Sequence, residues 1–170
     1  LSKSIIIATG AQARWLNLES EKKFKGFGIS ACATCDGFFF KDQSVIVVGG
    51  GNSAVEEALF LTKFASKVIL VHRRDKLRAE KILQERLFQN NKIEVIWNSK
   101  VIEFIGDDNP IMLKKVILEN VKNNKVSSIE IDGAFIAIGH DPATSLFKGK
   151  LNMDNENYII TKNESTETSI

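Results

Sequence analysis

The chain has 170 residues, of which 44% are hydrophobic and 26% charged, and its formal net charge is +2. This composition is typical of a globular protein, and the length predicts one domain with pieces of another. No basic run is long enough for a nucleic-acid footprint, and no apolar run is long enough to cross a membrane as a helix.

The N-terminal segment predicts a strand followed by a linker. The chain begins at Leu1 rather than Met and has no secretory signal, so we expect a fragment of a longer protein. Ser4-Ile5-Ile6-Ile7-Ala8-Thr9-Gly10 predicts a short β-strand that ends at glycine. Residues 11–25 are polar and predict a linker with a helical turn.

Both cysteines lie in the stretch Ala31-Cys32-Ala33-Thr34-Cys35-Asp36-Gly37. A Cys-x-x-Cys pair can close into a disulfide and reopen, and its thiols usually titrate below a free thiol, so that one is readily a nucleophile. The adjacent Asp36 is placed to pass a proton to or from the leaving sulfur. The pair therefore favours redox chemistry, with inert buried thiols as the alternative.

Other uses of the cysteines are less well supported. A structural zinc site needs four ligands, and only His72 and His140 could join the two cysteines, so we expect no metal. Two cysteines are also too few for a disulfide scaffold, which favours a reducing, cytoplasmic compartment. The rings of Phe38-Phe39-Phe40, which follow the pair, are predicted to pack in the core.

A βαβ unit is predicted next. Ser44-Val45-Ile46-Val47-Val48 is a continuous apolar run of the kind that forms a strand buried on both faces of a parallel sheet. Gly49-Gly50-Gly51 ends it, residues 52–65 have helical spacing, and residues 67–71 form a second apolar strand.

The glycine turn and the end of the second strand together predict a nucleotide site. In Gly49-x-Gly51-x-x-Ala54, the first glycine permits a tight turn, the second lets a pyrophosphate approach, and the alanine lets helix and strand pack closely. An NAD site usually has an acidic residue after the second strand. Here His72-Arg73-Arg74 and Arg78 stand there, and guanidinium groups suit the 2′-phosphate of NADPH. The alternatives are a glycine turn without ligand and a solvated basic loop.

The remaining elements continue the α/β pattern. They are a helix at 79–90, strands at 93–97 and 99–105, a turn at 106–110, an antiparallel pair at 112–121 and 126–132, and a buried strand at 133–139. Residues 151–170 have too little apolar content to form a core alone. The predicted fold is a parallel sheet with helices on one side and a small antiparallel layer on the other.

A nicotinamide site and a dithiol on one domain imply a further cofactor. A hydride carries two electrons, and thiols do not normally accept hydride directly, so a flavin is the expected converter. A flavin site would need a second dinucleotide fingerprint, and the 170 residues contain only one.

Four motifs, in this order, resemble bacterial-type (low molecular weight) thioredoxin reductase. They are Ala31 to Gly37, Gly49-Gly50-Gly51-Asn52-Ser53-Ala54, His72-Arg73-Arg74 through Arg78-Ala79-Glu80, and Ala137-Ile138-Gly139-His140. The resemblance covers nearly the whole chain and implies a Rossmann-like FAD/NAD(P)-binding domain. It also implies a homodimeric flavoprotein that moves electrons from NADPH through FAD and a dithiol to thioredoxin.

The resemblance also implies roles for single residues. Cys35 would face the flavin, Cys32 would attack thioredoxin, Asp36 would be the acid/base, and Glu56 would lie near the nicotinamide amide. The three arginines would hold the 2′-phosphate, and Ser53 replaces the family's threonine. The implied cofactor-binding set is Gly49, Gly50, Gly51, Asn52, Ser53, Ala54, Glu56, His72, Arg73, Arg74, Arg78, Ile138 and Gly139.

By the same resemblance the chain holds an NADPH-binding domain and the edges of a split FAD domain. We expect residues 1–24 to be an edge of the FAD domain and a hinge, residues 25–140 to be the NADPH-binding domain, and residues 141–170 to be a hinge and a returning FAD-domain segment. The chain alone is expected to lack FAD and activity. The alternatives are a flavoprotein reductase of a peroxiredoxin and a non-catalytic NADPH or redox sensor.

Overall fold

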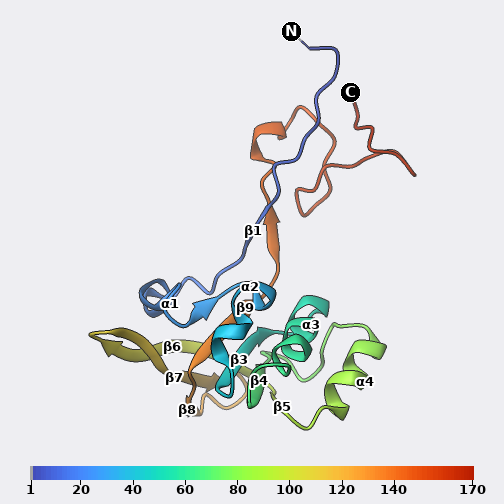
Figure 1. Cartoon of the computed structure of the whole chain (residues 1–170). Helices are drawn as coiled ribbons and strands as arrows, with labels where there is room; N and C mark the ends of the chain where they lie inside the picture. The colour runs from blue at the N-terminus through green and yellow to red at the C-terminus, as the bar shows by residue number, and fades with distance from the viewer. Residues whose placement is uncertain (1) are drawn as a thin grey trace. The chain divides into compact units, whose positions relative to one another are not determined.

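The computed structural model describes residues 2–170 and divides into two compact units (Figure 1). The core unit is Trp15–Gly139, and both clusters of buried hydrophobic side chains lie within it. The terminal unit consists of the chain up to Arg14 and of His140–Ile170. The assignment of 1–24, 25–140 and 141–170 to parts of a flavoprotein stays a prediction. None of the helices in residues 2–170 is long and apolar enough to cross a membrane.

The core unit is built on a five-stranded parallel sheet. Its strands, in spatial order, are β2 (Ile29–Ser30), β9 (Gly133–Ala137), β3 (Ser44–Gly49), β4 (Lys67–Val71) and β5 (Ile93–Ile96). Each neighbouring pair is parallel. A strand covered on both faces needs apolar side chains throughout, and Val45, Val47 and Phe135 are fully buried. The strands predicted at residues 44–48, 67–71, 93–97 and 133–139 are confirmed.

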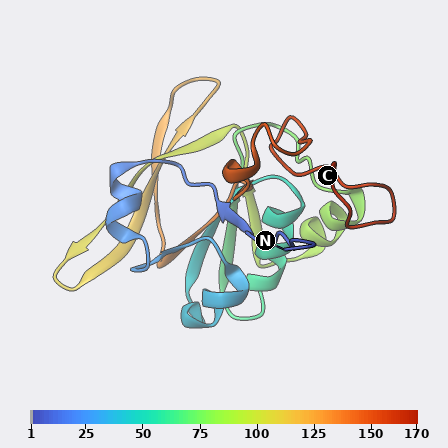
Figure 2. The ribbon, with the colours of Figure 1, turned by 90° about the horizontal axis from the view of Figure 1, so that it is seen from above.

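One face of the sheet is covered by α3 (Asn52–Leu61) and α4 (Lys81–Gln89). In Figure 2 these helices, teal and green, lie on the side of the parallel sheet opposite to the yellow and orange antiparallel strands. Both helices are shorter than predicted. The sequence pattern of residues 79–90 suggests an apolar side formed by Ile82, Leu83, Leu87 and Phe88, but Ile82 and Phe88 are 52% and 58% exposed. Because α4 packs chiefly against α3, a narrow stripe that includes the buried Leu87 is enough to hold it.

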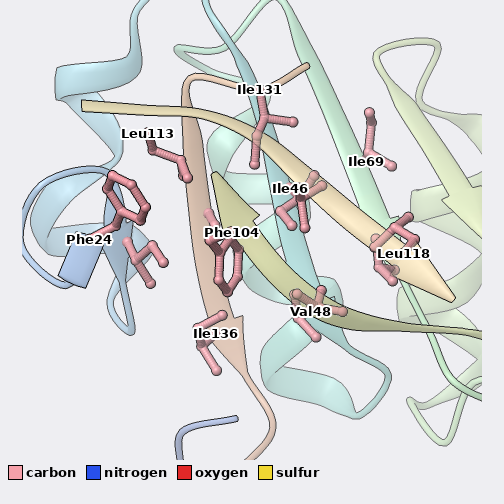
Figure 3. Packing of buried hydrophobic residues seen from close by; sticks show 14 residues of the cluster. Phe24, Ile46, Val48, Ile69, Phe104, Leu113, Leu118, Ile131 and Ile136 are labelled. Carbon is pink, nitrogen blue, oxygen red and sulfur yellow. The ribbon is translucent and has the colours of Figure 1, made fainter. Parts of the chain in front are cut away.

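The other face is covered by the antiparallel sheet of β6 (Ser99–Asp108), β7 (Ile111–Asn120) and β8 (Val126–Glu130). Figure 3 shows the side chains that join the two sheets: Ile46, Val48, Ile69 and Ile136 from the parallel strands, with Phe104, Leu113 and Leu118 from the antiparallel ones. The predicted antiparallel pair is confirmed. The turn is shorter than predicted, because β6 continues through Gly106 and only Asn109 and Pro110 lie between the strands.

The first loop of the core unit is fixed by a buried carboxylate. Glu21, on α1 (Glu19–Phe24), is 2% exposed. Its two oxygens accept the backbone N–H groups of Leu16 and Asn17 at 3.0 and 2.8 Å. Backbone groups without regular partners need such acceptors when they are buried. The predicted linker at 11–25 therefore contains a short helix and an ordered loop.

In the terminal unit, β1 (Ala11–Ala13) pairs with β10 (His140–Pro142), and an Arg14–Asp141 ion pair at 2.6 Å lies beside this ladder. A single turn of 3-10 helix, η2 (Ser145–Phe147), follows. The strand predicted at residues 4–10 is wrong. These residues have no strand partner among residues 2–170, and Ile5 and Ile6 are 80% and 93% exposed. A β-branched sequence favours an extended chain, but a strand exists only when a neighbour accepts its hydrogen bonds.

We expect Phe104→Ala to lower the free energy of unfolding of the chain by about 3–5 kcal/mol, because it empties a ring-sized volume between the two sheets. Urea denaturation followed by circular dichroism measures the change. Phe27→Ala removes the same ring from a site that is 55% exposed, and it should cost less than about 0.5 kcal/mol. Equal losses for the two variants would contradict the position of Phe104 in the core.

Candidate active site

Cys32 and Cys35 form a disulfide at α2 (Ala33–Asp36), directly after β2. Their Cα atoms are 5.3 Å apart. The Cys32 N–H donates to Ser30 Oγ at 3.0 Å, and the Cys35 N–H lies 3.2 Å from Cys32 Sγ. Asp36 follows, and its N–H donates to the Cys32 carbonyl at 3.1 Å. Cys32 is half-buried and Cys35 exposed. The pair is therefore oxidised and open to a reaction partner, with a carboxyl group on the next residue.

The aromatic residues after the disulfide do not all pack in the core, which corrects the prediction for two of them. On the 3-10 turn η1 (Gly37–Phe40), Phe38 and Phe39 are 56% and 67% exposed, and their ring centroids are 4.0 Å apart. Phe40 alone packs inward, edge-on against Phe135. Consecutive residues of a 3-10 turn point in three directions, so one core-facing position is the most that this turn can supply.

The glycine loop between β3 and α3 uses its glycines in three ways. A Cβ on Gly49 would lie 2.6 Å from the Cβ of Ala54, so its absence lets strand and helix touch. A Cβ on Gly50 would overlap the ring of the buried His72. A Cβ on Gly51 would meet nothing within 4 Å, so the space before α3 is open. An open helix N-terminus with unpaired N–H groups suits an anionic group.

The segment after β4 is hydrogen-bonded to this glycine loop. The Arg78 N–H donates to the Gly50 carbonyl at 2.7 Å, and the Glu80 N–H donates to Asn52 Oδ1 at 2.9 Å. Nε2 of His72 lies 2.9 Å from a backbone carbonyl of the same segment. The glycine loop and the basic segment thus form one continuous surface.

Within residues 2–170, the basic side chains on this surface have no acidic partner. Arg73, Arg74 and Arg78 are exposed, and none of them forms an ion pair within the described part of the chain. The acid between them, Asp75, pairs instead with Lys122 at 3.3 Å, and this hydrogen bond lowers the pKa of its carboxyl. The guanidinium groups therefore keep their donors for another anion.

The topology brings the predicted site segments to one edge of the parallel sheet. The disulfide follows β2, the glycine loop follows β3, the basic segment follows β4, and Ile138 and Gly139 follow β9. Because all these strands are parallel, their carboxyl ends lie at the same edge, where α/β proteins bind ligands. Ser53 and Glu56 are exposed on the first turns of α3, at the same edge.

Sequence reasoning missed Glu57, which lies on the side of α3 that packs against α2. The Ala33 N–H hydrogen-bonds to its carboxylate, while its Oε2 is fully buried and has no partner among residues 2–170. Burial raises the pKa of Glu57 to about 7, and the Ala33 hydrogen bond opposes the rise. A signal was present, because Glu57 lies three residues after Ala54 and four before Leu61, on the buried stripe of the helix.

Comparisons with known proteins agree with this geometry. The family model described as pyridine nucleotide-disulphide oxidoreductase matches residues 1–170. A thioredoxin reductase of Rickettsia felis is 59% identical over 169 residues, which are 99% of this chain and 54% of that protein. A thioredoxin reductase of Streptomyces coelicolor is 51% identical, over 99% of this chain and 52% of its own length. The chain thus spans about half the length of the curated relatives it matches.

A solved structure supports the fold and the family. The crystal structure of Lactococcus lactis thioredoxin reductase in its FR conformation is 44% identical, with a TM-score of 0.88 over 99% of this chain and 55% of that one. The predicted α/β fold, with a parallel sheet, helices on one side and an antiparallel layer on the other, is confirmed. The chain therefore belongs to the pyridine nucleotide-disulphide oxidoreductase family, and its resemblance to bacterial-type thioredoxin reductases is confirmed.

Proposed function

We propose that this chain is the part of an NADPH-dependent thioredoxin-disulfide reductase that binds NADPH and carries the redox-active pair. One observation carries the proposal: a disulfide at an exposed position and a dinucleotide-type glycine loop share one edge of one parallel sheet. The names of the relatives support thioredoxin as the disulfide partner. The scarcity of cysteines supports a reducing compartment such as the cytoplasm.

NADPH rather than NADH fits the nucleotide surface. The open space at Gly51 can admit a pyrophosphate, and the unpaired N–H groups of α3 can bind it. Arg73, Arg74 and Arg78 stand where a ribose phosphate of the same nucleotide would lie, and bidentate guanidinium groups bind phosphate well. Glu56 is exposed on α3, so its carboxyl group can meet the polar amide of the nicotinamide.

FAD belongs to the intact enzyme in this proposal, as does the homodimer. A bound flavin supplies the conversion of hydride chemistry into two-electron reduction of a disulfide. The residues of this chain do the rest: the arginines and the glycine loop orient the nucleotide, and Cys32 and Cys35 receive two electrons. Cys32 then attacks the thioredoxin disulfide, Cys35 resolves the mixed disulfide, and Asp36 exchanges the proton with the leaving sulfur.

We expect Arg73→Ala with Arg74→Ala to weaken NADPH binding by about 1.5–3 kcal/mol for each charged hydrogen bond lost, or roughly ten- to 150-fold in Kd per bond. NADH has no 2′-phosphate, so its Kd should change little. Isothermal titration calorimetry on the chain measures both. Arg86→Ala, an exposed arginine of α4, is the matched control and should affect neither nucleotide. Equal losses for NADPH and NADH would contradict the phosphate assignment.

We expect the Cys35→Ser variant to form a mixed disulfide with thioredoxin faster than Cys32→Ser, by an order of magnitude or more, because Cys32 is the proposed attacking thiol. The target is a thioredoxin that keeps only its reactive cysteine, activated as an aryl disulfide. Non-reducing electrophoresis with time gives the two rates, and the variant that lacks both cysteines sets the background. Equal rates for the two single variants would show that the proposed roles of the cysteines are wrong.

A further inference from the structure

Glu57 lies behind the disulfide with an incompletely satisfied carboxylate. In the described part of the chain, the backbone N–H of Ala33 hydrogen-bonds to it, and this N–H belongs to the peptide group between Cys32 and Ala33. Its second oxygen, Oε2, is buried without a partner among residues 2–170. A half-buried carboxylate with one buried, unpartnered oxygen is poorly stabilised as an anion, and a proton on Oε2 would remove the unfavourable charge.

Among residues 2–170, no neighbouring cation compensates this carboxylate. The charged residues on α3 itself and on the elements that pack against it are Glu56 on α3, Asp36 on α2, Lys67 on β4, and Lys81, Glu85 and Arg86 on α4; β3, β9 and η1 carry none. In the described part of the chain none of them forms an ion pair with Glu57. Burial alone raises the pKa of this carboxyl to about 7, so its protonation responds to small changes nearby.

We propose that Glu57 is a positioning residue that takes up a proton when the Cys32–Cys35 disulfide is reduced. In this step two electrons enter from a dithiol or a reduced flavin, and the S–S bond breaks. One sulfur takes a proton and becomes a thiol, the other stays a thiolate, and the second proton goes to the Glu57 carboxylate. The charge that reduction adds at sulfur is thus balanced one peptide group away. This inference rests on the redox use of the pair that is proposed above.

The direction of the coupling follows from electrostatics. A thiolate at Cys32 or Cys35 is a second negative charge near a carboxylate that water reaches poorly, and like charges disfavour ionisation at both groups. Reduction therefore increases the proton affinity of Glu57. Conversely, an ionised Glu57 opposes formation of the thiolate, so the pair becomes harder to reduce as Glu57 loses its proton above pH 7.

The test compares wild type with Glu57→Gln, which keeps the side-chain size and an oxygen for the Ala33 N–H but stays neutral. The equilibrium constant for reduction by dithiothreitol is measured from pH 6 to 8 by alkylation and mass spectrometry. The compared quantity is the equilibrium constant for reduction of the wild type divided by that of the variant. We expect this ratio to be constant below pH 7 and to fall about three- to tenfold between pH 7 and 8. Tenfold, or about 30 mV, is the limit for one proton per two electrons.

Glu85→Gln makes the same change at an exposed position of α4, and its ratio to wild type should be level throughout. A level ratio for Glu57→Gln, with a pair that dithiothreitol reduces normally, would overturn this inference and leave the proposed function standing. A pair that dithiothreitol cannot reduce would overturn both.

A second measurement needs no variant and covers the case in which Glu57→Gln does not fold. Glutamate labelled with ¹³C at the carboxyl carbon is followed by NMR against pH in the oxidised and the reduced wild-type chain. We expect one glutamate to titrate near pH 7 in the oxidised chain and at a higher pH in the reduced chain. The same midpoint in both redox states, or no midpoint above pH 6, would sink the proposal.

Discussion

The contact at Gly49 determines how the rest of the site is placed. At this residue β3 ends, α3 begins within reach of Ala54, and the carbonyl of the last β9 residue fills the space that any side chain would need. Close packing of this kind allows little adjustment, because a single added methyl group would move strand or helix. This close contact sets the direction of α3. The direction of α3 in turn determines where the open space at Gly51 lies and which surface α2 packs on. Gly50 is packed equally closely against the ring of His72, and this contact joins the glycine loop to the basic segment.

The sequence predicts the centre of this fold well and its margins poorly. Parallel strands are recognisable because burial on both faces requires apolar residues at every position, as in Ser44–Gly49. Residues 4–10 have the same local character but form no strand, since pairing depends on a neighbour that local sequence does not specify. The prediction that Phe38 and Phe39 pack in the core was wrong for a related reason. Their chemistry predicts burial, but the turn that carries them can turn only one of three rings inward.

The candidate site also has parts that the sequence predicts and a part that it does not. The disulfide and the glycine turn could be predicted, because each corresponds to a short sequence spacing with a direct chemical meaning, whereas the phosphate-binding role of the arginines stays a prediction. Glu57 was not, although it lies next to Glu56 in the sequence. Its properties come from contacts distant in the sequence: α2 donates one N–H group, and Oε2 is buried in the folded chain. The spacing along α3 indicates that Glu57 is on the buried side, but no sequence motif tells which segment covers it, and the fold supplies that information.

A single helix connects both halves of the proposed chemistry. The first turn of α3 borders the nucleotide surface through Gly51 and Asn52, and its middle meets the disulfide segment through Glu57. A ten-residue helix seated on a close-packed sheet is rigid on the scale of these contacts. The nucleotide surface and the disulfide therefore keep a fixed separation. If both serve one flavin in turn, the exchange has to move the core unit as one body, because nothing within α3 can bring either group closer alone. The same rigidity holds Glu57 against the Cys32–Ala33 peptide, which is the contact that the proposed proton uptake requires.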